Sequence, residues 1–250
     1  MAKGRGAWPK TGTGGTLAPS AIIKGKTIPG PYYMLAGTGE TKVGASKTNL
    51  NELAVNHGVL ALQVLAQRYF ENVTDGRTVP ITGVFDAKTK AAMKDIQKRA
   101  GLVSDGQVGL KTAKVLIMPL IKDTGKDLWP LVYGIVKNEG GFDPGAVGRM
   151  DNNDLGLAQI NILSHPDVSF SNAFCPSFAM KWLTTYFTDA IAKFKNTDDA
   201  IASYNLGGGG TRQWIKAGRP DIWTREGVPD RPVRAYIERI KGAAAKDGLI

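Results

Sequence analysis

One acidic residue, Glu139, continues an apolar helical pattern where another hydrophobic residue would be expected. The stretch from residue 127 to 139 places apolar side chains at helical spacing, namely Leu128, Leu131, Val132, Ile135 and Val136. Glu139 takes the next position on that face, and Gly140 and Gly141 after it are a natural helix stop. Partial burial and the negative end of the helix dipole both disfavour an ionised carboxylate, so we expect a raised pKa, which suits a general acid. The alternative is a Glu that only ends the helix and reaches into solvent.

Three further motifs follow Glu139 in order, and helices are expected to position them. Glu139 leads into Phe142, Pro144 and Ala146, then Gly156, Leu157, Gln159 and Ile160, then Tyr204, Asn205 and Gly207, and lastly Tyr236, Ile237 and Ile240. A long amphipathic helix with Trp182, Leu183, Phe187 and Phe194 on one face is expected between the second and third motifs. A capped helix starting near Thr197 and a final helix through Tyr236 carry the last two motifs.

These four motifs, in this order, resemble the soluble lytic transglycosylase family, which has a lysozyme-like all-α fold. The resemblance implies cleavage of the β-1,4 bond between N-acetylmuramic acid and N-acetylglucosamine in peptidoglycan. Glu139 would protonate the glycosidic oxygen and then deprotonate the muramoyl 6-hydroxyl, which closes a 1,6-anhydro ring. Because the nucleophile belongs to the sugar, one carboxylate suffices, and we expect neither a cofactor nor a metal.

The resemblance also implies roles for other residues of the motifs. Gln159 and Asn205 would hydrogen-bond the sugar amides, while Tyr236 would orient Glu139 or the reacting sugar. Tyr204 and Trp214 would flank the substrate groove, and packing in the core is the alternative for these two rings.

Two features depart from the family pattern. Many members have Ser nine positions after the catalytic Glu, where this chain has Gly148. The sugar contact of that hydroxyl is then lost or supplied from elsewhere, for example from the polar loop at residues 149–154. If Asp151 or Asp154 in that loop held a water opposite Glu139, the enzyme would instead be a goose-type hydrolase. A solvated loop without a role is the other alternative.

A weak internal repeat lies upstream, between residues 57 and 121. The segment Thr-Gly-Val-Phe-Asp-Ala-Lys-Thr at 82–89 is echoed 23 positions later by Asp-Gly-Gln-Val-Gly-Leu-Lys-Thr at 105–112. A Leu-Gln helix around Gln63 precedes the first copy, and a helix that ends near Gln97 separates the two. The pattern resembles the small three-helix peptidoglycan-binding domain family, from which Thr82 and Asp86 depart. An unrelated helical spacer is the alternative.

Residues 1–56 are rich in Gly, Lys, Thr and Pro and show no sustained periodicity. Seven Lys and Arg residues oppose two Glu residues there, so this segment carries +5 of the total net charge of +10. Such a composition does not form its own core. We therefore expect an extended basic arm that docks on a partner, such as another protein of a phage virion or tail.

Composition excludes several other classes of function. The 250 residues, 42% of them hydrophobic, suffice for one large or two small globular domains. No apolar run approaches the about 20 residues of a membrane span, and no apolar core of a secretory signal follows the N-terminus. Cys175 is alone, and His57 and His165 have no zinc-site spacing with it. No nucleic-acid-binding motif accompanies the positive charge, which suits an anionic bacterial wall.

The sequence therefore predicts a mainly α protein in three parts. These are a basic arm at 1–56, a three-helix peptidoglycan-binding-like domain at 57–121, and a lysozyme-like catalytic domain at 126–250. We expect a bacteriophage lysin that is carried in the virion, as a tail or internal protein, and acts on the host wall. Holin-dependent release from the host cytoplasm is the alternative route. A structural tail or tip component that binds the wall without cleaving it is the competing function.

Overall fold

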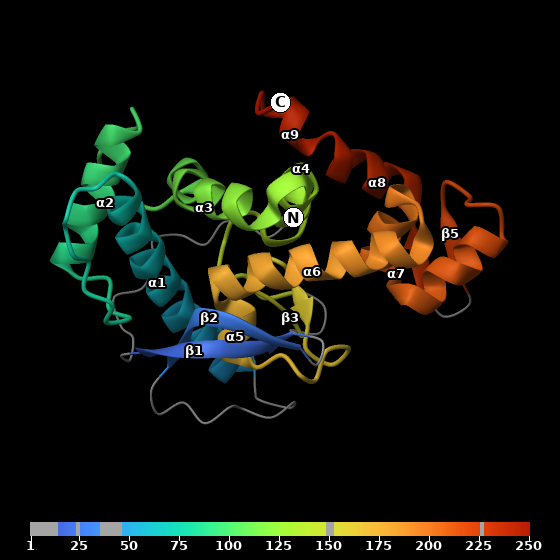
Figure 1. Cartoon of the computed structure of the whole chain (residues 1–250), viewed down its shortest axis with the longest axis horizontal. Coiled ribbons are helices and arrows are strands. Elements are labelled where there is room, and N and C mark those ends of the chain that lie inside the picture. The colour runs from blue at the N-terminus through green and yellow to red at the C-terminus, as the bar shows by residue number, and fades with distance from the viewer. Residues whose placement is uncertain (1–14, 24–25, 36–46, 149–152, 226–227) are drawn as a thin grey trace.

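The computed structural model describes residues 15–23, 26–35, 47–148, 153–225 and 228–250. Over these ranges the chain is mainly helical, which confirms the predicted fold class (Figure 1). The α-helices are α1 (Lys47–Asn72), α2 (Ala87–Arg99), α3 (Leu110–Gly125), α4 (Trp129–Ile135), α5 (Phe170–Phe174), α6 (Pro176–Phe194), α7 (Thr197–Lys216), α8 (Val233–Lys241) and α9 (Ala243–Lys246). A 3-10 turn, η1 (Lys126–Leu128), precedes α4, and a π-helix, η2 (Val136–Gly140), follows it.

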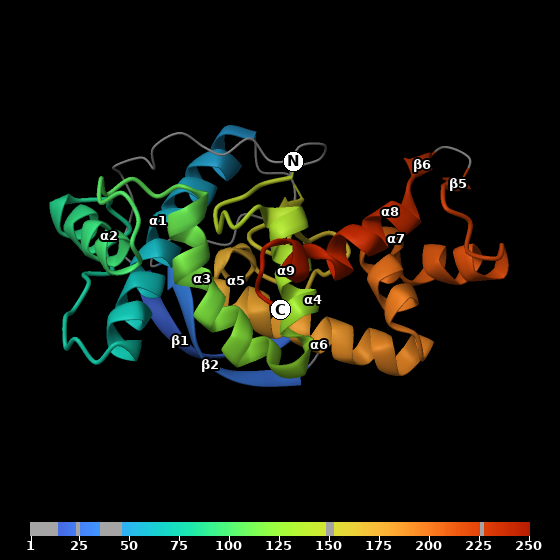
Figure 2. The same ribbon diagram turned by 90° about the horizontal axis from the view of Figure 1, so that it is seen from above.

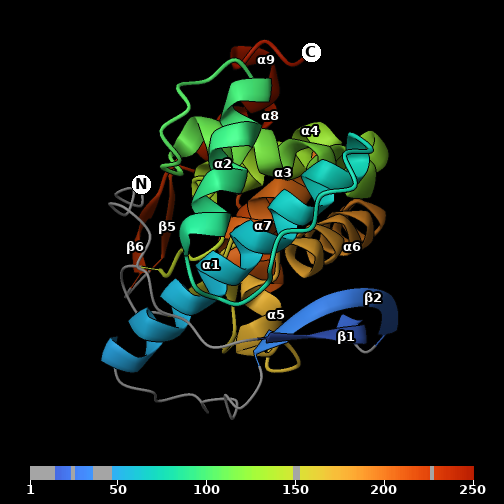
Figure 3. The ribbon, with the colours of Figure 1, turned by 90° about the vertical axis from the view of Figure 1, so that its left-hand side faces the viewer.

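The strands are short and pair only as antiparallel hairpins. The pairs are β1 (Gly15–Ile23) with β2 (Lys26–Leu35), β3 (Asp154–Leu155) with β4 (Ile160–Asn161), and β5 (Trp223–Arg225) with β6 (Val228–Arg231). The first hairpin falls within the predicted basic arm and lies against α5 and α6 (Figures 1 and 3). Residues 1–14 and 36–46 of that arm lie outside the described residues.

A buried glutamine closes the first of two similar turns in the α1–α3 module. The Gln63 side chain from α1 accepts hydrogen bonds from the backbone N–H groups of Thr82 and Gly83, at 2.9 and 2.8 Å. Its amide nitrogen donates to the Thr89 hydroxyl in α2 at 2.9 Å. Because Gln63 has no solvent exposure, these bonds satisfy an amide that would otherwise be costly to bury.

Gln97 repeats this arrangement at the second turn. Its side chain accepts from the Gly106 N–H at 2.8 Å and donates to the Thr112 hydroxyl of α3 at 3.1 Å. It also donates to the Asp105 carboxylate at 3.1 Å, as Gln63 does to the Thr82 hydroxyl at 3.2 Å. The echo in the sequence is therefore a structural repeat. The Thr82 hydroxyl accepts the hydrogen bond in the first copy that the Asp105 carboxylate accepts in the second.

The other departure in the first copy, Asp86, has a local structural reason. Its carboxylate caps α2 by accepting the Thr89 N–H at 2.8 Å, whereas Gly109 at the start of α3 makes no side-chain cap. This hydrogen bond holds the pKa of the Asp86 carboxyl below its usual value. An Asp in place of Gly therefore adds a helix cap to the first turn.

The two helical regions share one core. A single cluster of buried side chains extends from Leu60 in α1 to Ala244 in α9. Figure 2 shows α3 between α1 and α4, and α3 runs directly through η1 into α4. The boundaries expected at 56–57 and 121–126 fall inside α1 and at the end of α3. The region that carries Glu139 thus packs directly on the repeat module.

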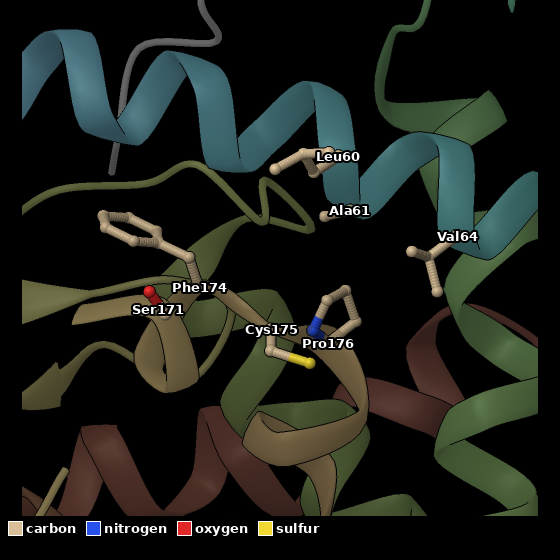
Figure 4. Close-up of a pocket in the computed structure, with 7 residues that line it drawn as sticks. All are labelled: Leu60, Ala61, Val64, Ser171, Phe174, Cys175 and Pro176. Carbon is tan, nitrogen blue, oxygen red and sulfur yellow. The ribbon is translucent and has the colours of Figure 1, made fainter. Parts of the chain in front are cut away.

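A small apolar pocket marks the contact between α1 and the corner where α5 meets α6. Its lining residues are Leu60, Ala61, Val64, Ser171, Phe174, Cys175 and Pro176 (Figure 4). Cys175 is buried and lines this pocket as a small hydrophobic residue. Along the described ranges, no helix is long and apolar enough to cross a membrane.

An ionic cluster around Asp247, just after α9, fastens the C-terminus to three other elements. Its carboxylate accepts hydrogen bonds from Lys114 of α3 at 2.5 Å, from Lys137 of η2 at 2.7 Å, and from the Tyr133 hydroxyl of α4. The three donors, Lys114 foremost, hold the pKa of the Asp247 carboxyl well below its usual range. Asp247 therefore links the repeat module to the helix that carries Glu139.

We expect Asp247→Asn to lower the free energy of unfolding by about 1–3 kcal/mol at neutral pH, because three donors lose a charged acceptor. Since the folded-state pKa is depressed, this stabilisation is present above the unfolded pKa of about 3.9 and is lost as pH falls below it. Urea denaturation of both proteins between about pH 7 and pH 3 measures the difference, which should shrink with acidification.

Asp123→Asn is the matched control, because Asp123 pairs with Arg68 at 2.7 Å but its side chain is 58% exposed. An exposed pair contributes at most about 1 kcal/mol. If the two variants lost the same stability at neutral pH, the Asp247 cluster would not be a structural link.

Candidate active site

Glu139 lies where the helix changes from α to π geometry. The sequence predicts an α-helix that continues to this residue, but α4 ends at Ile135 and the last turn is the π-helix η2. The wider π turn moves Glu139 away from the core stripe, so it is half-buried while Val136 is fully buried. Gly141 ends the turn with a left-handed φ of 58°.

Two glycines let other elements approach this helix closely. A Cβ atom at Gly140 would lie 2.3 Å from the backbone oxygen of Leu157, in the turn between β3 and β4. A Cβ atom at Gly134 would lie 2.3 Å from the backbone oxygen of Ile240, in α8. The absence of both side chains therefore allows the β3–β4 hairpin and α8 to pack closely against the helical segment that carries Glu139.

The Glu139 carboxylate is held through one of its two oxygens. The Tyr236 hydroxyl from α8 donates to Oε1 at 2.7 Å, and the Asn138 side-chain amide donates to the same oxygen at 3.1 Å. Among the described residues no donor reaches Oε2. These two hydrogen bonds fix the orientation of the Glu139 carboxyl group.

The hydroxyl groups of Tyr236 and Tyr204 remain protonated in this environment. Burial, followed by the negative charge of Glu139, raises the pKa of Tyr236 well above its usual value of 10.0. Burial and the same carboxylate also raise the pKa of Tyr204 well above 10.0. Both side chains therefore act only as neutral hydrogen-bond donors or acceptors near Glu139.

The Tyr204 side chain is held in place by a backbone hydrogen bond and by ring packing. Its hydroxyl donates to the Ala158 backbone oxygen at 2.5 Å, and its ring stacks on Phe187 with centroids 5.6 Å apart. Trp214 is fully buried, and its indole N–H donates to the Pro220 backbone oxygen at 2.9 Å. Trp214 is thus a core residue, while Tyr204 connects α7 to the turn beside Glu139.

Gln159 stabilises the β3–β4 turn from within. It has a left-handed φ of 49°, and its amide nitrogen donates to the backbone oxygens of Gly156 and Ala146, at 3.0 and 3.3 Å. The side chain is half-buried, so part of it remains accessible. The Gln159 side-chain nitrogen would therefore already donate to these two backbone oxygens if the residue contacted a sugar amide.

Asn205 has a partner that the sequence does not suggest. Arg231, at the end of β6, donates through Nη1 to the Asn205 backbone oxygen at 2.6 Å and to its side-chain oxygen at 3.2 Å. Arg231 therefore engages both carbonyl oxygens of Asn205 and ties α7 to β6. No motif marked Arg231, since the contact joins residues 26 positions apart on different elements.

The structure describes one of the two aspartates of the polar loop. Asp151 lies outside the described residues. Asp154 is the first residue of β3 and accepts a hydrogen bond from the Asn161 side chain at 2.9 Å. After burial and the charge of Glu139, the charge of Asp154 is a smaller contribution to the raised pKa of Tyr204.

We expect Tyr236→Phe to lower kcat about tenfold or more, because the hydrogen bond that orients Glu139 is lost. The raised pKa of Tyr236 means that the wild-type rate should show no tyrosine ionisation near pH 10. Turbidity loss of a peptidoglycan suspension measures both effects. Tyr69→Phe in α1, which removes a hydroxyl remote from Glu139, should keep the wild-type rate, and equal losses in the two variants would contradict the orienting role.

The site as a whole presents one oriented carboxyl group beside protonated tyrosines and amide side chains. Such a set can transfer a proton to and from an uncharged substrate and can hydrogen-bond its polar groups. Within the described residues no group of three or more His, Cys, Asp or Glu side chains could hold a metal ion.

Comparison with protein-family models gives two matches. Residues 121–222 match the Transglycosylase SLT domain, and residues 60–116 match the Putative peptidoglycan binding domain. Glu139, Gln159 and Asn205 lie within the first match, while Tyr236 lies beyond its end. No match was found among curated proteins or among solved structures. The chain therefore contains a Transglycosylase SLT domain that is preceded by a putative peptidoglycan-binding domain, the organisation that its sequence motifs predict.

Proposed function

We propose that this protein is a peptidoglycan lytic transglycosylase with Glu139 as its general acid and base. The observation that supports this most is the 2.7 Å hydrogen bond from the Tyr236 hydroxyl to Oε1 of Glu139, which orients the carboxyl group. The two domain matches support peptidoglycan as the substrate. The half-buried position of Glu139 is compatible with direct access by a polymer chain.

In the proposed reaction the Glu139 carboxyl group gives up one proton and then takes up another. Oε2 of Glu139 donates its proton to the glycosidic oxygen, and the bond between that oxygen and C1 of N-acetylmuramic acid breaks. The Glu139 carboxylate then accepts the proton of the 6-hydroxyl, whose oxygen bonds to C1 and forms the 1,6-anhydro ring. No water is consumed, and Glu139 ends the cycle protonated. Asn205 and Gln159 would hold the sugar amides.

The product distinguishes this reaction from hydrolysis. Purified peptidoglycan is digested with the protein, and the new sugar ends are analysed by mass spectrometry. The proposal predicts anhydro ends, which are one water lighter than hydrolysed ends. Hydrolysed ends alone would instead support a goose-type muramidase with a water held by Asp151 or Asp154. A digest without new ends would support a structural wall-binding protein.

The repeat module has a supporting role in this proposal. A wall-binding module that is joined to a cleaving module raises the effective substrate concentration at the active site. Because the two share one core, binding by the module also fixes the orientation of the site relative to the wall. The net charge of +10 favours association with the anionic groups of the wall.

We further propose that the protein is a bacteriophage lysin carried in the virion, with residues 1–56 docking on other virion proteins. The charge of +5 in this segment supports a docking role. Mass spectrometry of gradient-purified phage particles tests this location, and the protein should be present at a fixed ratio to the tail proteins. Its presence only in the host cytoplasm would instead support holin-dependent release.

A further inference from the structure

Phe142 closes the turn that carries Glu139 and has an unusual backbone conformation. Its N–H donates to the Val136 backbone oxygen at 3.4 Å, so residues 136–142 form a closed turn around Glu139, which we call the Glu139 turn. The φ of Phe142 is 60°, in the left-handed region that bulky L-residues rarely adopt. Such a conformation persists only where the surrounding structure holds it. The contacts of the Phe142 side chain therefore affect the position of Glu139.

The Phe142 ring is held by side chains from two helices. It is buried and packs against the Tyr133 ring of α4, with the two centroids 5.3 Å apart. The Lys114 ammonium group of α3 lies 5.4 Å from the Phe142 centroid and 5.7 Å from the Tyr133 centroid. A cation over an aromatic ring is attracted by the ring electrons, more strongly where water is partly excluded. Lys114, from the repeat module, thus contacts the residue that closes the Glu139 turn.

The same lysine reaches the start of the Glu139 turn through Asp247. Lys114 donates to Oδ2 of Asp247 at 2.5 Å, and Lys137 donates to Oδ1 at 2.7 Å. The Lys114 and Asp247 side chains are 30% and 21% exposed, so solvent screens this ion pair less than a fully exposed one. Lys137 precedes Glu139 by two residues, and Phe142 follows it by three. Lys114 is therefore connected to the turn on both sides of Glu139.

We propose that Lys114 is a positioning residue for Glu139, which it holds in place through Asp247 and the Phe142 ring. This inference rests on the proposed function, since it concerns the orientation of the proposed general acid and base. It gives the repeat module a second role beside wall binding, because one of its side chains supports the active site. Loss of the Lys114 charge then loosens the Glu139 turn without removing any group that touches the substrate.

The first test is the rate of Lys114→Met, which removes the charge but keeps a long apolar side chain. The substrate is a soluble glycan fragment of alternating N-acetylglucosamine and N-acetylmuramic acid, so binding of the module to an insoluble wall does not influence the rate. Because the catalytic group is misplaced while the sugar contacts stay, kcat should fall about tenfold and KM should stay within about twofold. Lys114→Arg keeps a cation that packs on aromatic rings and should retain at least about a third of the wild-type kcat.

Lys111→Met is the matched control for this substitution. Lys111 lies three residues earlier on α3, and its side chain is exposed. The control makes the same chemical change on the same helix and should keep the wild-type rate. Circular dichroism checks that each variant is folded at the assay temperature. Equal kcat for Lys114→Met and wild type, a change in KM alone, or equal losses in the two Met variants would overturn the proposal.

Hydrogen–deuterium exchange measures the Glu139 turn without turnover. Peptides that cover residues 136–142 should exchange at least about tenfold faster in Lys114→Met than in wild type, while peptides from α7 should exchange at the wild-type rate. If Lys114→Met does not fold, Lys137→Met removes the other end of the link, from a side chain that is 36% exposed. The same increase in exchange is then expected for Lys137→Met, and unchanged exchange at 136–142 would contradict the proposal.

The wild-type digest separates this inference from the proposed function. If wild type forms no new sugar ends, the enzymatic proposal fails, and the exchange measurement still decides whether Lys114 holds the Glu139 turn. If wild type cleaves the glycan fragment and Lys114→Met cleaves it with the same kcat, only the inference about Lys114 fails.

Discussion

Glu139→Gln is expected to reduce peptidoglycan cleavage about 10²- to 10⁴-fold, the range that general acid–base catalysis contributes. The amide has the shape of the carboxyl group and can accept the Tyr236 hydrogen bond through its oxygen. It cannot deliver a proton to the glycosidic oxygen or take one from the 6-hydroxyl. Release of soluble muropeptides, quantified by chromatography, measures the loss.

The structure provides a matched control for this substitution. Glu238 lies on α8, the helix that carries Tyr236, but its side chain is exposed. Glu238→Gln makes the same chemical change and should retain the wild-type rate. Thermal unfolding of both variants should match wild type, because neither substitution changes side-chain volume. Equal muropeptide release by Glu139→Gln and wild type would favour the structural wall-binding alternative.

Regular patterns in the sequence were sufficient to predict much of the architecture. Helical periodicity predicts α6 and the mainly helical fold, because a helix that buries one face must repeat apolar residues at that period. The echo between 82–89 and 105–112 predicts the repeat, since each copy needs the same buried Gln and Thr pairing. Both features depend on residues near one another in the sequence.

The local geometry at Glu139 could not be predicted in the same way. An apolar pattern of period 3.6 predicts an α-helix, but the last turn becomes a π-helix where Gly140 meets the Leu157 carbonyl. That contact joins two segments with no shared pattern. The periodicity identified Glu139 as exceptional, while its half-buried position follows from tertiary packing.

Contacts made by single polar residues also escaped prediction. The contact between Arg231 and Asn205 joins elements far apart in the sequence, as does the contact between Asp247 and Lys137. Neither Arg231 nor Asp247 belongs to a motif. A lone charged residue is usually solvated, so its type carries no information about a partner. The continuous core also forms from helices on both sides of the domain boundary expected at residues 121–126.

Gly140→Ala is expected to lower both the stability and the activity of the protein. Its Cβ would lie 2.3 Å from the Leu157 backbone oxygen, and neither backbone can move without disturbing the π turn or the β3–β4 hairpin. Overpacking of this kind costs about 1–3 kcal/mol or more, so the free energy of unfolding should fall by at least that amount. Displacement of Leu157 also moves Glu139 relative to Gln159, so any folded protein should have a lower kcat.

The neighbouring residue supplies the control that separates crowding from backbone strain. Gly141 has a left-handed φ of 58°, yet a Cβ atom there would meet nothing within 4 Å. Gly141→Ala should therefore cost only the about 1–2 kcal/mol of an L-residue in that conformation. Chemical denaturation and muropeptide release are measured on both variants. If Gly141→Ala were as inactive as Gly140→Ala, the left-handed turn, and not the contact with Leu157, would determine the position of Glu139.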